Sequence, residues 1–259
     1  MPEEPKIILP TGPRPALRKN PKRILFYGPP KVGKTTFVAG LPNNFIFDLE
    51  EGTELISAMS ERMDSLEDVR RYGKAIMLAG RPYKHVTVDT ITKLESWCEW
   101  DATLSYMNSP IGKNFNRNDN GGMLSRNEWK SVLTITSSNG TGSNFSPGYL
   151  WLRKSFEYWS DSFGVLAPSL IMIAHLRDKV IDKKGAEVSA KDIDLMGKLR
   201  NIVSANVDAI GYMYRHTVSP GVTELRINFK SSDEVLCGSR CEHLKGQDIP
   251  ADWSKIFID

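Results

Sequence analysis

The stretch RILFYGPPKVGKTT, residues 23–36, decides the fold of this chain. A short apolar run with strand character fills its first part and stops at a glycine. The fixed positions of the phosphate-loop pattern GxxxxGK[ST] are then filled without a mismatch by Gly28, Gly33, Lys34 and Thr35. A helix is expected to begin directly after them. A strand, a glycine loop and a helix in this order predict a nucleotide site in an α/β fold.

Each fixed residue of the pattern has a chemical role. The two glycines let the backbone turn tightly and aim its N–H groups inward, Lys34 can reach the β and γ phosphates, and the Thr35 hydroxyl can hold Mg²⁺. We therefore predict ATP and Mg²⁺ as ligands. The predicted nucleotide-binding residues are Gly28, Pro29, Pro30, Lys31, Val32, Gly33, Lys34, Thr35 and Thr36.

Overall composition is that of an ordinary soluble protein. The net charge of +3 is too small to indicate a nucleic-acid partner by itself. No apolar run is long enough for a membrane span, so we expect a cytoplasmic protein, in the host cell if a phage encodes it. Cys98, Cys237 and Cys241 make no disulfide framework. Cys237, Cys241 and His243 could suggest a metal, but buried or idle thiols are favoured because no second ligand pair exists.

Two strand ends carry acidic residues. The run FIFDLEEG, residues 45–52, ends in carboxylates, and Glu50 is predicted to activate the water that attacks the γ-phosphate. An exposed acidic turn is the alternative, above all for Glu51. The run HVTVD, residues 85–89, closes on Asp89, which is expected to hold Mg²⁺ together with Thr35.

A third strand ends in a histidine. Residues 169–174 form a continuous apolar run typical of a central parallel strand, and His175 follows it. A polar side chain there would lie beside the γ-phosphate and could distinguish ATP from ADP. We predict this sensor role, with a purely structural histidine as the alternative.

Two polar stretches carry scattered basic residues. The first is residues 108–148 and the second is residues 177–199, a second basic loop. Cations interleaved with aromatic residues suit a single nucleic-acid strand. An insertion without a ligand, or merely solvated charge, remains open as the alternative. The candidate DNA-binding residues are Lys113, Arg117, Arg126, Lys130, Arg177, Lys179, Lys183 and Lys184.

The two ends of the chain differ in character. Residues 1–22 are rich in proline and basic, so we expect an extended arm that is either a solvated tail or a contact to a neighbouring subunit or a polyanion. Near the other end, two alternating strands flank Ser219-Pro220-Gly221 as a hairpin. We predict a single α/β domain over residues 23–259, with a mostly parallel sheet, helices on both faces and an antiparallel hairpin at one edge.

The ordered set GPPKVGKT, FIFDLEEG, HVTVDTIT and LIMIAHLRDK resembles the RecA-like ATPase core, and more closely the phage RecA-like ATPases of the Sak-type single-strand annealing group. The resemblance covers nearly the whole chain from about residue 22. It implies Glu50 as the catalytic base, Asp89 as the metal acid, and both basic stretches as the DNA path. It also implies a cation acting across a subunit interface, for which the candidates are Lys230 and Arg240. RecA itself usually has glutamine where this chain has His175.

The function predicted from these features is ATP-dependent binding of single-stranded DNA by a filament or ring, promoting annealing or strand exchange in recombination and replication. Lys34, Glu50 and His175 would serve hydrolysis, and a single-strand-binding protein is a further expected partner. A hexameric helicase or motor core, a nucleotide kinase and a non-hydrolysing nucleotide-dependent scaffold are the alternatives.

Overall fold

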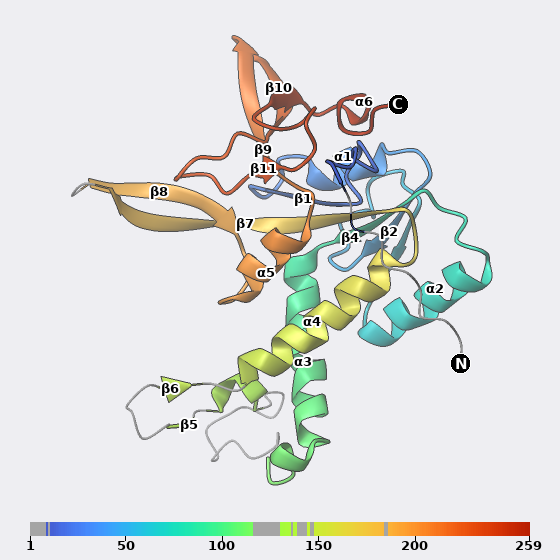
Figure 1. Cartoon of the computed structure of the whole chain (residues 1–259), viewed down its shortest axis with the longest axis vertical. Coiled ribbons are helices and arrows are strands. Elements are labelled where there is room, and N and C mark those ends of the chain that lie inside the picture. The colour runs from blue at the N-terminus through green and yellow to red at the C-terminus, as the bar shows by residue number, and fades with distance from the viewer. Residues whose placement is uncertain are drawn as a thin grey trace.

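The computed structural model describes residues 9, 11–115, 130–135, 137–138, 144–145, 148–183 and 186–259. Within these residues a ten-stranded sheet carries helices on both faces (Figure 1). Its strands are β1 (Arg23–Gly28), β2 (Asn44–Asp48), β3 (Ser60–Arg62), β4 (His85–Asp89), β7 (Ser169–Lys183), β8 (Ala186–Ile193), β9 (Ala209–Ser219), β10 (Val222–Asn228), β11 (Gly238–Ser239) and β12 (Asp248–Pro250).

Helices connect these strands. The α-helices are α1 (Lys34–Ala39), α2 (Leu66–Leu78), α3 (Ile91–Met107), α4 (Gly148–Gly164), α5 (Leu199–Asn206) and α6 (Trp253–Ile256). Between α3 and α4 lie two 3₁₀ turns and a separate strand pair, namely η1 (Pro110–Gly112), η2 (Val132–Thr134), β5 (Ser137–Ser138) and β6 (Asn144–Phe145). No helix within the described ranges is long and apolar enough to cross a membrane.

The strand order places three predicted site residues at one edge of the sheet. Strands β9, β1, β7, β4, β2 and β3 are neighbours in this order and run parallel, whereas β8, β10, β11 and β12 pair antiparallel. Gly28 at the end of β1 pairs with His175, and Asp89 at the end of β4 pairs with Asp48. The predicted fold class, a mostly parallel sheet with helices and a C-terminal antiparallel hairpin, is confirmed.

Strand β1 is buried on both faces, which explains its continuous apolar sequence. Leu25 and Tyr27 face the core formed with α2, α3, α4 and α5, while Ile24 and Phe26 face the core under α1 and α6. The terminal helix α6 docks on α1, because the Trp253 indole donates to the Phe37 carbonyl at 2.9 Å and the two rings stack at 4.2 Å.

Two helices begin at side-chain caps. Ser65 accepts a hydrogen bond from the Asp68 amide and so caps the start of α2. Thr90 caps α3 in the same way through the Lys93 amide. The second cap fixes the start of α3 directly behind Asp89, the last residue of β4.

The predicted basic loop at residues 177–199 is wrong for most of its length. Strand β7 does not end at Ala174 but continues to Lys183 and returns as β8, with register from Leu176↔Ile193 to Lys183↔Ala186. Residues 177–180 are exposed, and the run Arg177-Asp178-Lys179 contains no apolar side chain, so this part of β7 lacks the hydrophobic alternation that marks a half-buried strand. The β7–β8 hairpin projects from the body of the molecule (Figure 1).

The stretch at residues 108–148 is partly packed rather than a free loop. Phe115 meets Tyr106 edge-on at 5.5 Å between ring centroids, and the buried Val132 amide donates to Thr103 Oγ1 at 3.1 Å. Figure 1 shows this region at the distal end of the α3 and α4 pair, away from the sheet. Arg117 and Arg126 lie outside the described residues.

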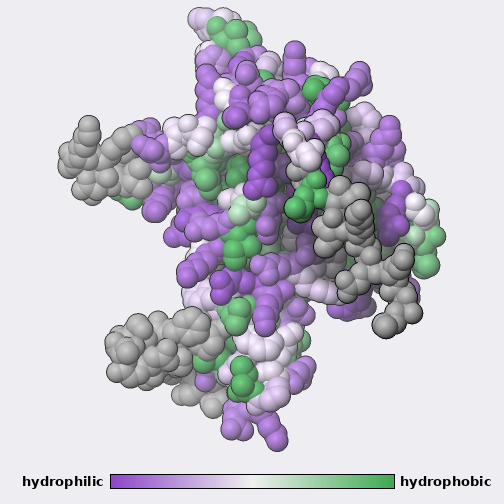
Figure 2. All heavy atoms as spheres, in the orientation of Figure 1, coloured by the Kyte–Doolittle hydropathy of each residue, from purple (hydrophilic) through white to green (hydrophobic). Residues whose placement is uncertain are grey.

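The arm contacts the body near its junction with β1. Arg18 forms a two-point ion pair with Asp208 at 2.8 and 3.0 Å, and Asn20 exchanges two hydrogen bonds with the backbone of Ile258. The division into an arm and one ATPase domain stays a prediction. The face shown in Figure 2 is mainly hydrophilic, with a hydrophobic patch at the tip of the β9–β10 hairpin, where Val218 and Val222 are exposed.

Candidate functional site

The phosphate loop joins β1 to α1 at the carboxyl edge of the sheet. Lys31 and Gly33 adopt positive φ angles of 60° and 115°, which produces the tight turn that the motif requires. The Lys34 ammonium donates to the carbonyl oxygens of Gly28 and Pro29 at 2.8 and 2.9 Å. Burial lowers the pKa of Lys34, against the opposing attraction of Asp89 and Glu50. The lysine therefore lies across the mouth of the loop.

Thr35 and Asp89 meet beside the loop. The Thr35 hydroxyl donates to Asp89 Oδ2 at 2.7 Å, and Asp89 is only 4% exposed. Burial raises the pKa of Asp89 to about 6, although the Thr35 hydrogen bond opposes the shift. One hydroxyl and one carboxylate fit Mg²⁺, which is usually bound through few protein oxygens together with substrate phosphates. These two residues would hold the ion.

Asp48 organises the turn that carries Glu50. This buried carboxylate accepts hydrogen bonds from the amides of Glu50, Gly52 and Thr53 and from the Thr53 hydroxyl, at 2.7–3.0 Å. A Cβ atom on Gly52 would lie 3.2 Å from Thr35 Oγ1, so the turn passes close to the phosphate loop. The alternative of an exposed acidic turn therefore does not apply to Asp48, which is 1% exposed.

Glu50 is held by two side chains, one directly after β4 and one within β7. Thr90 donates to Oε1 at 3.0 Å, and His175 Nε2 lies 2.8 Å from Oε2. Burial favours a higher pKa for Glu50, but the hydrogen bonds from His175 and Thr90 outweigh it and lower the pKa. The same hydrogen bond to Glu50 raises the pKa of His175. Glu51, in contrast, pairs with Arg62 at 2.5 Å on the surface.

The structure places Arg240, one of the two candidate trans-acting cations, away from the phosphate loop of its own chain. Arg240 donates from its backbone to Asp208 and from its side chain to Ala205, beside β11, which pairs with the first residues of β9. That is the amino edge of the parallel strands, opposite the loop. Lys230 follows β10 just beyond Asn228, which pairs with Tyr212. Their predicted action on a neighbouring subunit remains a prediction.

The candidate DNA-binding cations fall into two separate places. Arg177 and Lys179 are exposed on β7, close after His175, and the backbone of Lys183 lies at the end of the same strand. Lys130 packs over the Phe115 ring at 5.3 Å, and Lys113 is exposed beside η1. Helix α3 separates this second group from Thr90 by about 25 Å, at 1.5 Å per residue. Lys184 lies outside the described residues.

Sequence reasoning missed three residues that shape the site. Asp48 has no role of its own in the predicted acidic turn, Thr90 is not singled out by any motif, and Arg215 of β9 donates to the Val32 carbonyl at 3.1 Å. The preference of threonine for helix caps could have indicated Thr90. Nothing in the local sequence indicates Arg215, because its partner is 183 positions away.

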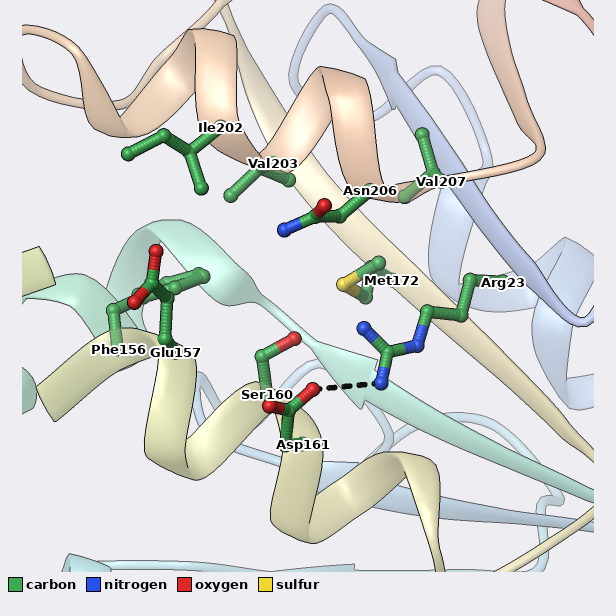
Figure 3. Close-up of a pocket in the computed structure, with 10 residues that line it drawn as sticks. All are labelled: Arg23, Phe156, Glu157, Ser160, Asp161, Met172, Ile202, Val203, Asn206 and Val207. Atoms are coloured by element: carbon green, nitrogen blue, oxygen red, sulfur yellow. Dashed lines mark hydrogen bonds and ion pairs between the residues drawn. The ribbon is translucent and has the colours of Figure 1, made fainter. Parts of the chain in front are cut away.

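A pocket of about 120 Å³ between α4, α5 and the start of β1 is not this site (Figure 3). Arg23 and Asp161 form an ion pair at 2.7 Å across it, while Ile202 and Val203 line the other wall. Arg23 begins β1 and Gly28 ends it, so the pocket lies at the opposite edge of the sheet from the phosphate loop.

The cysteines form no metal centre in the part of the chain that the structure describes, where no group of three His, Cys, Asp or Glu residues could hold an ion. The Cys237 thiol instead donates to the Lys230 carbonyl at 2.8 Å, and His243 Nε2 donates to the Ile256 carbonyl at 3.0 Å. Burial raises the pKa of the Cys237 thiol to about 12, so it stays protonated at neutral pH.

A family model described as an AAA domain matches residues 20–241, which includes every strand end of the site. The chain belongs to the AAA domain family. Its P-loop site is therefore that of an ATPase-type domain. No curated protein matches the sequence.

Two solved structures resemble this AAA domain distantly. The KaiC-like protein PH0186 from Pyrococcus horikoshii OT3 has 9% identity and a TM-score of 0.39, over 88% of this chain and 84% of that one. The flagellar accessory protein FlaH from Methanocaldococcus jannaschii has 10% identity and a TM-score of 0.34, over 80% of this chain and 76% of that one.

Proposed function

We propose that the chain is a Mg²⁺-dependent ATPase in which Glu50 activates the attacking water. The observation that carries this proposal is the position of Glu50, held by Thr90 and His175 beside the phosphate loop. A carboxylate with a lowered pKa is ionised at neutral pH and can orient a water and accept its proton. Mg²⁺ bound by Thr35 and Asp89 would neutralise charge on the phosphates.

Lys34 completes the electrostatics of the site. Its ammonium is bonded to two loop carbonyls at the place where phosphates bind in this motif. Exchange of these neutral acceptors for anionic phosphate oxygens gives hydrogen bonds in which both donor and acceptor are charged, and these are stronger than the bonds to the carbonyls. Lys34 thus favours the nucleotide-bound state of the loop.

His175 connects this chemistry to the β7–β8 hairpin. The residue belongs to β7, and its backbone amide donates to Thr92 Oγ1 of α3 at 3.1 Å. The Thr92 hydroxyl in turn donates to the carbonyl of Asp194, which follows β8, at 3.2 Å. A change at the γ-phosphate that moves Glu50 or His175 would therefore act on the first residues of the hairpin in β7 and on Asp194, which follows β8.

We further propose that this hairpin binds single-stranded DNA in an ATP-dependent manner. Arg177 and Lys179 support the proposal because they are exposed and no ion pair to either occurs among the described residues. Cations on an exposed ribbon can follow a phosphate backbone. The resemblance to the phage Sak-type annealing ATPases adds annealing or strand exchange by a filament or ring, with a single-strand-binding protein as partner.

Fluorescence anisotropy with a labelled single strand tests this function. Binding should be tighter with ATP than with ADP or without nucleotide, and should weaken steeply with salt because phosphate contacts release counterions. Replacing both Arg177 and Lys179 by Gln should weaken binding about tenfold and reduce the salt slope by about 2.

The matched control removes the same charge elsewhere. Lys74 and Lys84 are exposed and lie on α2 and before β4, away from the hairpin. Their replacement by Gln should leave DNA binding within about twofold of the wild type. Equal weakening by both double variants would show a nonspecific charge effect, and no binding in any nucleotide state would contradict the DNA-binding proposal.

A further inference from the structure

The β9–β10 hairpin forms the outer wall of the phosphate loop. A Cβ atom on Gly28 would lie 2.3 Å from the Met213 carbonyl oxygen, so β9 touches the first glycine of the motif. A Cβ atom on Gly33 would lie 3.4 Å from an Nη atom of Arg215 and 3.5 Å from Cδ2 of Leu225. Both fixed glycines of the loop are therefore in contact with this hairpin.

Arg215 fixes one peptide unit of the loop. Its Nε donates to the Val32 carbonyl at 3.1 Å, between Lys31 and Gly33, the two loop residues with positive φ. In a planar trans peptide the N–H points away from the C=O. By holding the Val32 carbonyl on the outside, Arg215 directs the Gly33 N–H toward the inside of the loop, where phosphates are bound.

Among the described residues, no acidic side chain competes with the Val32 carbonyl for the Arg215 guanidinium. Arg215 is exposed, and among the described residues no carboxylate pairs with it, whereas Arg226 on the neighbouring strand is paired with Glu224 and Asp248. Leu225, which contacts Gly33, is the cross-strand partner of Arg215. The two side chains thus hold the loop as one unit of the hairpin.

We propose that Arg215 is a positioning residue through which the β9–β10 hairpin sets the conformation of the phosphate loop and senses its occupancy. The inference rests on the proposed nucleotide site but assigns a residue and an element that the motif does not contain. The Gly33 N–H of the Val32–Gly33 peptide would bind phosphates that ATP and ADP share. Arg215 therefore supports the binding of both nucleotides. Coupling is reciprocal, so nucleotide binding in turn stabilises the hairpin.

The test compares nucleotide affinity with turnover. Arg215→Met keeps the length of the side chain and removes its donors, and should raise the Kd for both ATP and ADP about tenfold. At saturating ATP the kcat should stay within about twofold, because Glu50 is untouched. Arg215→Lys keeps one donor and should restore part of the affinity. His216→Gln, the next exposed residue of β9, is the control and should bind as the wild type does.

Hydrogen exchange gives a second readout that a merely structural role would not change. ATP should slow exchange at residues 213–225 in the wild type and in the control, but not in Arg215→Met. Unchanged Kd values in Arg215→Met, with normal binding by the wild type, would overturn the inference and leave the proposed ATPase standing. A wild-type protein that binds no ATP would overturn both.

Discussion

His175 within β7 and Glu50 after β2 are joined by a hydrogen bond of 2.8 Å between Nε2 and Oε2. The two residues are 125 positions apart and come from strands that are separated in the sheet by β4. The bond places the proposed general base and the proposed γ-phosphate sensor in direct contact. Whatever displaces one of them acts on the other.

Replacing His175 by Ala should uncouple DNA binding from nucleotide state. The ratio of single-strand affinities with ATP and with ADP should fall to about one, because Glu50 no longer has a partner on β7. Nucleotide affinity itself should change little, since the His175 side chain is bonded to Glu50 and not to the phosphate loop. Anisotropy titrations with both nucleotides measure the ratio, and an unchanged ATP preference would contradict the sensor role.

The same pair gives stability a defined pH dependence. The pKa of His175 is raised, so its contribution is complete below the unfolded value of about 6.5 and is lost as pH rises through the folded value. The pKa of Glu50 is lowered, so its contribution is present above the unfolded value of about 4.3 and is lost as pH falls through the folded value. The pair therefore stabilises most between about pH 4.3 and 6.5.

Both side chains are about a third or more exposed, at 40% and 32%, so solvent screening limits their coupling to about 1 kcal/mol or less. His175→Gln should lower the free energy of unfolding at pH 5.5 more than at pH 9. Urea unfolding at both pH values, with His216→Gln as control, measures the difference. A larger effect at pH 9 would contradict the ion pair.

Asp48→Ala should be strongly destabilising. It removes a buried carboxylate that accepts hydrogen bonds from three amides and a hydroxyl, and the loss of these bonds should cost about 3 kcal/mol. Because this turn carries Glu50, kcat should fall as well. Asp64→Ala, at an exposed surface ion pair, should change stability by less than about 0.5 kcal/mol. Equal effects of both changes in urea unfolding would refute the organising role of Asp48.

Gly28→Ala tests the contact between β9 and the loop. The added Cβ would meet the Met213 carbonyl oxygen at 2.3 Å, and moving backbone to relieve it should cost about 1–3 kcal/mol. Gly40 has a φ of −75° and a nearest contact of 3.5 Å, so Gly40→Ala should be tolerated. Thermal unfolding of the two variants gives the comparison. A neutral Gly28→Ala would show that the loop and β9 can separate freely.

Much of the fold could be predicted because its signals are local. The fixed residues of the phosphate loop lie within a few positions of one another, and the same holds for the residues of the β-branched strand that ends at Asp89. The candidate residues after these strands could be chosen because the carboxyl ends of parallel strands lie along one edge of the sheet, where ligands bind.

The remaining features depend on contacts between distant residues. Residues 177–180 of the β7–β8 hairpin are exposed and begin with three charged residues, so periodicity did not indicate that β7 continues past His175. Asp48 and Glu50 have similar sequence surroundings. Only the folded turn shows that the Asp48 carboxylate accepts hydrogen bonds from backbone amides, whereas the Glu50 carboxylate contacts His175. The same holds for Arg215, whose partner Val32 belongs to another part of the chain.

The Glu50→Gln variant provides the most direct measurement, with ATP turnover followed by phosphate release and ATP affinity followed by titration in the same protein. The substituted amide keeps the size of the side chain but cannot accept the proton of water, so turnover should fall by about 100-fold or more while the Kd for ATP stays within about threefold. Unchanged turnover in this variant would contradict Glu50 as the base and remove the basis for the proposed ATPase mechanism.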